Sequence, residues 1–76
     1  MTPGEIELAR IHMKYTRSVW LGYFRDRRVF ESRTLPHGDP ADVRYHADIL
    51  VPREREAKLI YAKALNALCC ARAVAS

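Results

Sequence analysis

The sequence predicts an α+β domain in which an N-terminal helix, a β-hairpin, a third strand and a long C-terminal helix follow one another (α-β-β-β-α). Three observations lead to this fold class: a helix-start signal at residues 2–5, a run of β-forming residues over 18–35, and a strongly helix-forming stretch after Pro52. The 76 residues make one small basic domain, 1–76. A domain of this size buries only about 60% of the surface of its unfolded chain, so a partner or self-association would help it to fold.

The first helix is expected from about residue 3 to residue 17. Thr2, Pro3 and Glu5 supply an N-cap, a proline at the first helical position and a glutamate three residues after the cap, which is the pattern of a capping box. Ile6 and Met13 then lie on one apolar stripe at helical spacing.

Residues 18–35 are expected to form the hairpin, with the turn at 25–28. Pairing Phe24 with Val29 places Trp20 on the outer face, opposite Arg33. The other face, which we expect to be covered by helix, holds four apolar residues: Val19, Leu21, Tyr23 and Phe30.

An all-α bundle or helical hairpin is the alternative fold, in which the first helix continues through Gly22 as far as Arg33. Two features favour it. Arg27 and Glu31 have the spacing of an ion pair on one helix face, and Ile6, Met13 and Trp20 recur every seven residues.

After a Pro- and Gly-rich loop at 35–40, residues 43–51 are expected to form the third strand. Five apolar residues alternate there with polar ones: Val43, Tyr45, Ala47, Ile49 and Val51. In the alternative interpretation, Asp39 and Asp42 cap a short helix.

Pro52 is expected to open the long C-terminal helix. One apolar face gathers six residues: Ala57, Ile60, Tyr61, Ala64, Leu68 and Ala71. Leu65 and Cys69 widen this surface beyond what one small sheet needs, which predicts a homodimer through the C-terminal helix.

The composition favours a binding function, and the sequence contains none of the residue patterns that are typical of catalytic sites. The net charge is +4, and residues 10–33 alone carry a net +5, which favours an acidic protein surface or nucleic acid as partner. The three histidines are scattered, no pair of ligands has a zinc spacing, and the three glycines are isolated. We therefore expect no enzyme, no metal and no cofactor.

The cysteines and the hydropathy predict a cytoplasmic protein. Cys69 and Cys70 are adjacent and are expected to be two small buried thiols. No apolar run reaches the roughly 20 residues that span a bilayer, and residues 1–8 lack a basic region followed by an apolar one, so neither a membrane span nor a secretory signal is expected.

Two stretches resemble double-stranded RNA-binding domains. PHGDPADVRYHADILV is similar to the loop and second strand of that family, and EAKLIYAKALNAL to its final helix. The resemblance implies phosphate contacts from the start of that helix. Here the helix begins Arg53-Glu54-Arg55-Glu56, where acids alternate with the cations, so the likeness is one of pattern.

The predicted function is a small non-enzymatic binding protein that docks on a protein or nucleoprotein partner. Its short, motif-free chain is typical of inhibitors or regulators from phages or mobile elements, such as anti-CRISPR proteins. The alternative is direct binding of nucleic acid. The expected partner-binding residues form an outer aromatic and basic surface: Trp20, Phe24, Arg25, Arg27, Arg28 and Arg33.

Overall fold

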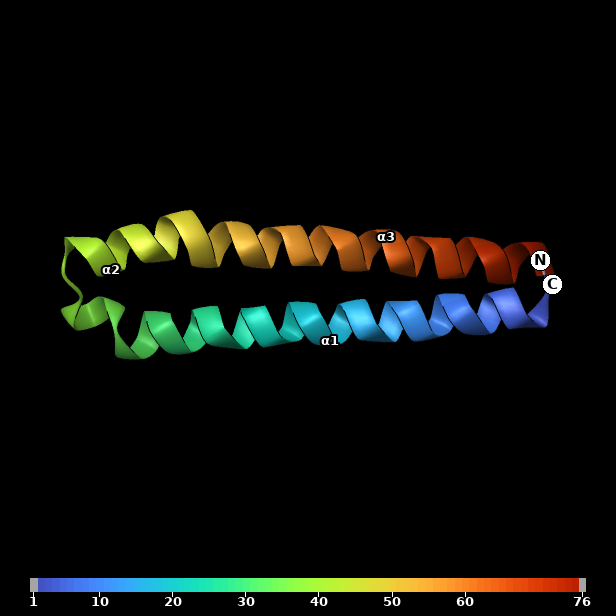
Figure 1. The fold of residues 1–76 in the computed structure, drawn as a ribbon, viewed down its shortest axis with the longest axis horizontal. Coiled ribbons are helices and arrows are strands. Elements are labelled where there is room, and N and C mark those ends of the chain that lie inside the picture. The colour runs from blue at the N-terminus through green and yellow to red at the C-terminus, as the bar shows by residue number, and fades with distance from the viewer. Residues whose placement is uncertain (1, 76) are drawn as a thin grey trace.

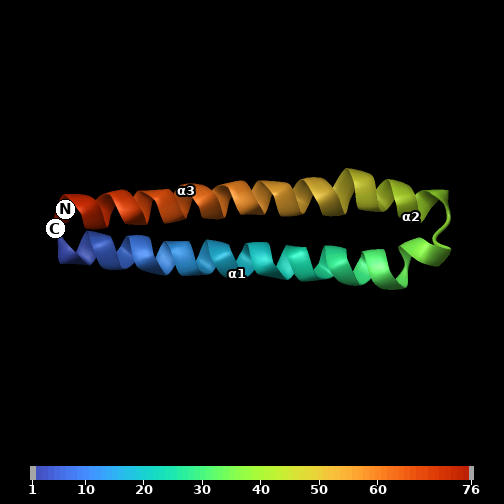
Figure 2. The same ribbon diagram turned by 180° about the vertical axis from the view of Figure 1, so that it is seen from behind.

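The computed structural model describes residues 2–75 as a hairpin of two long helices. Helix α1 (Pro3–Arg33) leads through a short 3₁₀ turn, η1 (Leu35–His37), to α2 (Pro40–Tyr45), a π-helical turn, η2 (His46–Leu50), and α3 (Val51–Ala75). Helices α1 and α3 lie side by side in opposite directions, with both chain ends at the same end of the hairpin (Figures 1 and 2). The hairpin is 53 Å long and 16 and 14 Å across.

The predicted α-β-β-β-α fold is wrong, because residues 2–75 contain no strand. The all-α helical hairpin, which was the alternative, describes the chain. The implied similarity to the sheet of double-stranded RNA-binding domains fails with it: residues 43–51 lie in α2, the following π-helical turn and the first residue of α3.

Helices α1 and α3 pack against each other along one stripe of residues on each helix. Successive residues of a stripe are alternately three and four positions apart in the sequence. This is the spacing of a coiled-coil seam. We call these positions the seam. In α1 the seam contains Ile6, Ala9, Met13, Thr16, Trp20, Tyr23, Arg27 and Phe30. In α3 it contains Glu54, Ala57, Tyr61, Ala64, Leu68 and Ala71.

Seam packing explains why residues 18–33 are helical although many of them favour strands. Trp20, Tyr23 and Phe30 continue the three-four spacing that begins at Ile6, and a strand would turn them to opposite faces. The cross-strand pairing of Trp20 with Arg33 is therefore absent. The ion pair expected in the helical alternative is present, with Arg27 Nη1 2.7 Å from Glu31 Oε1.

Two of the three helix starts that the sequence indicated carry the expected caps, while the third helix, expected to open at Pro52, begins at Val51 and follows the π-helical turn directly. Thr2 Oγ1 accepts a hydrogen bond from the Glu5 amide at 3.2 Å, ahead of Pro3. Asp39 and Asp42 form a reciprocal capping box, in which each carboxylate accepts the other residue's backbone N–H, at 3.0 and 3.2 Å. The short helix that was an alternative to the third strand is therefore confirmed.

The connection between the two arms is tight at Gly38. A Cβ added there would lie 3.0 Å from the Cβ of Asp42 and 3.1 Å from the carbonyl oxygen of Thr34. A larger residue would require these neighbours to move by a few tenths of an ångström, so glycine suits the close approach between the end of α1 and the capping box.

A wide π-helical turn, His46–Leu50, joins α2 to α3 without breaking the helical path. It ends two residues before Pro52, whose ring would clash with the carbonyl of the residue four positions earlier in a regular helix. The turn buries Leu50, which is 7% exposed, and places His46 beside α1.

Candidate functional site

Trp20 lies in the middle of the seam and joins α1 to α3. Its ring stacks on Tyr61, with centroids 5.4 Å apart and planes 9° apart. Its indole Nε1 donates a hydrogen bond to Glu54 Oε1 at 3.0 Å. Lys58 Nζ lies 5.9 Å from the centroid of the same ring. Only part of the indole remains exposed, so Trp20 has a structural role whatever else it contacts.

Polar contacts continue from Trp20 along the seam toward the turn. Arg27 Nη2 lies 4.0 Å from Glu54 Oε1, which links the two helices. Glu31, which pairs with Arg27, also has its Oε1 2.9 Å from His46 Nε2. These side chains are only partly exposed, between 14% for Glu54 and 30% for Glu31, so the contacts are shielded from much of the solvent.

Hydrogen bonds from His46 and then Arg27 hold the pKa of Glu31 below its ordinary value. A carboxyl group whose pKa is lowered by folding stabilises the folded state fully above its unfolded pKa, about 4.3, and loses that contribution as the pH falls through its folded pKa. We expect the free energy of unfolding to fall below about pH 4.3, and Glu31→Gln to flatten this dependence. Urea unfolding at a series of pH values measures both. Identical pH profiles for the two proteins would contradict the assignment.

The six predicted partner-binding residues do not form one surface. Trp20 and Arg27 lie in the seam, and Phe24 lies at its edge, 37% exposed, with the Arg27 guanidinium 5.4 Å from its ring centroid. Arg25, Arg28 and Arg33 are exposed. Arg28 and Arg33 are five residues apart on α1, which turns them toward opposite flanks of the helix.

One broad side of the hairpin is strongly basic. Its cations flank the seam on both helices and recur at helical spacing, and we call this side the basic face. It comprises Arg10, Lys14, Arg17 and Arg28 on α1, and Arg55, Lys58 and Arg72 on α3. Within α1 and α3, the acids on this side are Glu7 and Glu31, so seven cations and two acids of these two helices give a formal charge of +5.

The opposite broad side, the neutral face, carries equal numbers of charges of each sign. Within α1 and α3, its acids are Glu5, Asp26 and Glu56, and its cations are Arg33, Arg53 and Lys63. Its apolar residues come from both helices: Leu8, Tyr15, Val19, Ile60, Ala67, Cys70 and Val74. Because three positive and three negative charges share it, this face has no formal net charge.

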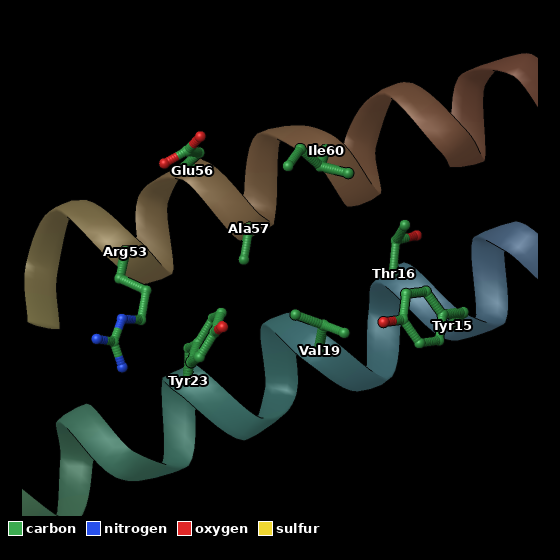
Figure 3. A pocket seen from close by; sticks show the side chains of 8 residues that line it. All are labelled: Tyr15, Thr16, Val19, Tyr23, Arg53, Glu56, Ala57 and Ile60. Atoms are coloured by element: carbon green, nitrogen blue, oxygen red, sulfur yellow. The ribbon is translucent and has the colours of Figure 1, made fainter.

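A shallow groove crosses the middle of the neutral face. Tyr15 and Val19 of α1 line it, and so do Glu56 and Ile60 of α3, while Thr16 and Ala57 lie closer to the seam (Figure 3). At one end the Arg53 guanidinium lies 5.3 Å from the Tyr23 ring centroid. The groove is mainly apolar and open to solvent.

Of the residues on these two faces, the sequence indicated Arg28 on the basic face and Arg33 on the neutral face, and most of the others were missed. It counted charge by position along the chain, whereas the basic face combines residues from α1 and α3 that are far apart in sequence. The signal that finds them is helical phase: once the seam positions are aligned, the cations on one flank and the balanced charges on the other separate.

The thiols and metal-binding residues give no reactive cluster in the part of the chain that is described. Cys69 and Cys70 are free and exposed, which corrects the expectation of two buried thiols. Helix α3 is one layer of a two-helix hairpin, so residues on its outer sides stay in solvent. No three side chains from His, Cys, Asp and Glu gather within residues 2–75 in a way that would hold a metal ion.

Comparison with known proteins gives no relative: the chain matches no protein-family model, no curated protein and no solved structure. Within residues 2–75, neither long helix contains an apolar stretch of the length that crossing a lipid bilayer requires. The charges and shape of the hairpin therefore carry the functional argument.

Proposed function

We propose that this chain is a non-enzymatic binding protein that docks its basic face on an acidic protein or nucleoprotein partner, and regulates that partner by covering its surface. The observation that supports this is the unequal distribution of charge, with +5 on one broad side of the hairpin and none on the other. A net +4 spread evenly would attract anions weakly, whereas a one-sided field orients the hairpin as it approaches.

Most cations of the basic face make no ion pair within the described residues. Arg10 is bonded to Glu7, with its Nε 3.0 Å from Glu7 Oε2. No ion pair within residues 2–75 is recorded for five others: Lys14, Arg17, Arg28, Arg55 and Arg72. Guanidinium groups whose N–H donors form no ion pair within the chain can bind carboxylate or phosphate groups on a partner.

Phe24 and Leu65 give the basic face apolar contact area beside its cations. They are both 37% exposed and lie on opposite sides of the seam, near Trp20 and Tyr61. Arginine around partly exposed aromatic rings is the composition of protein-binding hot spots. An inhibitory role of the phage or mobile-element type stays a prediction, which rests on the short chain and its lack of motifs.

Direct binding of nucleic acid is the second candidate, and the length of the basic face favours it. Cations from Arg10 to Arg28 on α1 span about 27 Å at 1.5 Å per residue, roughly half of a rod 53 Å long, and those from Arg55 to Arg72 on α3 lie beside them. A strip of this kind follows the phosphates of a duplex without reading its bases.

We expect Arg17→Ala/Arg28→Ala/Arg55→Ala to weaken partner binding at least about tenfold, because three charge-assisted contacts are lost. The matched control, Arg25→Ala/Arg33→Ala/Arg53→Ala, removes the same charge from other sides of the hairpin and should retain affinity. Fluorescence anisotropy with generic duplex DNA and RNA at two salt concentrations decides between the candidates. Binding that falls steeply with salt supports direct nucleic-acid binding.

Absence of binding at low salt rejects the nucleic-acid candidate. A pull-down with the wild type and both triple variants then tests the first. It predicts a partner that the wild type and the control triple retain and the basic-face triple loses. Equal loss from both triples would show that net charge alone matters, which would contradict the assignment of the basic face.

A further inference from the structure

The hairpin exposes more surface than a compact monomer of its mass. A folded monomer of 8.8 kDa exposes about 4,800 Å², whereas this chain exposes 5712 Å². Its radius of gyration is 16.7 Å, against roughly 11 Å for a compact 76-residue domain. The excess is close to the roughly 800 Å² that each partner contributes to a stable interface.

The excess includes large apolar side chains on the neutral face. Leu8 is 68% exposed, Tyr15 67%, Ile60 47% and Val74 75%. Leu8 and Tyr15 come from the first half of α1, Ile60 from the middle of α3 and Val74 from its end. The first half of α1 and the second half of α3 lie side by side at the end of the hairpin that holds both termini (Figure 1). They therefore form one surface two helices wide.

Glycine at position 22 adds a second, independent observation on the same face. Gly22 lies inside α1, where glycine weakens a helix relative to alanine. A Cβ added there would meet nothing within 4 Å, so packing within the chain does not call for glycine. The missing side chain at Gly22 would let the backbone of another molecule pack closely against α1.

We propose that the neutral face is covered by a second copy of this chain, so that two hairpins form an antiparallel four-helix bundle with their basic faces outward. A second copy fits because the face has no net charge and two copies meet without repulsion. Two equal layers also match in length and width, which a single peptide helix would not. The proposal concerns the face that the proposed function leaves free.

The two-fold axis runs along the hairpin, so that α1 of one copy faces α3 of the other at the same height. Val19 and Ile60 share a height, since both line the groove, and would meet across the dimer (Figure 3). Asp26 would face Arg53 of the second copy, because their neighbours Arg27 and Glu54 are 4.0 Å apart. This arrangement pairs opposite charges, and it places the apolar residues near the termini of one copy against those of the other.

The homodimer expected through Leu65 and Cys69 would use the other side of α3. There Arg55, Lys58 and Arg72 flank those two residues, so an isologous contact would place cations of the two copies together. Charge therefore favours the neutral face over the basic face for self-association.

Sedimentation velocity and equilibrium at micromolar to millimolar chain concentration test the proposal. The wild type is expected to dimerise. Ile60→Glu and Leu8→Glu should each raise the dissociation constant at least about 100-fold, because a symmetric dimer contains each substitution twice. The control Leu65→Glu introduces the same charge on the basic face and should leave dimerisation intact. Circular dichroism confirms that each variant is folded; Leu8, at 68% exposed, is the safer site if Ile60→Glu unfolds.

A monomeric wild type over this range overturns the proposal, as does loss of the dimer in Leu65→Glu alone. Charge reversal tests the orientation. Asp26→Arg and Arg53→Asp should each weaken self-association, because like charges then face each other. Mixing the two variants should restore a heterodimer, in which both pairs are again opposite. Failure of the mixture to associate rejects the axis along the hairpin.

Discussion

Leu68→Ala should lower the free energy of unfolding by about 3 kcal/mol, because deletion of a buried leucine side chain leaves a cavity as well as losing apolar burial. Leu68 is 1% exposed and is the largest side chain that is fully buried in the described residues. Its neighbours along the seam of α3 are Ala64 and Ala71, which are too small to fill the space. Because small domains have only a few kcal/mol of stability, much of the variant should be unfolded at room temperature.

Leu59→Ala is the matched control for this prediction. It makes the same change on the outer side of the same helix, where Leu59 is 58% exposed. The expected effect is within about 0.5 kcal/mol, as for most surface substitutions. Urea unfolding followed by circular dichroism measures both variants, and an equal loss of stability from the two would contradict the seam.

Trp20→Ala should lower the free energy of unfolding by about 2–3 kcal/mol, somewhat less than for a fully buried tryptophan. The substitution removes the stack on Tyr61 and the hydrogen bond to Glu54 together. It also leaves the partly buried Glu54 carboxylate with a weaker set of partners, chiefly Arg27 at 4.0 Å. Trp20 is therefore a poor site for testing partner binding, since its loss affects the fold as well.

Trp20→Phe separates the two contributions. It keeps an aromatic ring against Tyr61 but loses the indole N–H that donates to Glu54 and part of the stacked ring area, so we expect a cost of about 1–2 kcal/mol. Thermal unfolding followed by circular dichroism measures both substitutions. If Trp20→Ala proved no more destabilising than Trp20→Phe, the stack between α1 and α3 would carry none of the stability assigned to it.

Local signals in the sequence predicted where helices begin. Thr2 and Pro3 start α1, Asp39 and Asp42 start α2, and the alanine-rich stretch after Pro52 is α3. These features act through neighbouring backbone groups, so they can be recognised without knowing what packs where.

Residues 18–35 could not be assigned in the same way. Val19, Trp20, Tyr23 and Phe24 favour strands locally, and the seven-residue repeat that overrides this becomes decisive only when α3 supplies a matching stripe. The alternation at 43–51 was misleading for a related reason. Val43 and Tyr45 are 53% and 44% exposed, so their spacing does not report a buried sheet face.

The assignment of the candidate surfaces also depended on whether residues 18–35 form a strand pair or a helix. With a strand assignment, Trp20 and Arg33 were expected on one outer face; with a helix, they separate, and Arg28 joins Arg55 and Arg72 from α3. The basic and neutral faces exist only once helical phase and the antiparallel pairing are both known, and no single segment of the sequence contains that information.

Nuclear magnetic resonance of the labelled protein tests whether α1 is continuous and packs on α3. We expect helical backbone chemical shifts without interruption through residues 18–33. We also expect nuclear Overhauser effects between the rings of Trp20 and Tyr61, whose centroids are 5.4 Å apart. Strand-type shifts over the same residues, with cross-strand contacts between Phe24 and Val29 and none between Trp20 and Tyr61, would contradict both expectations.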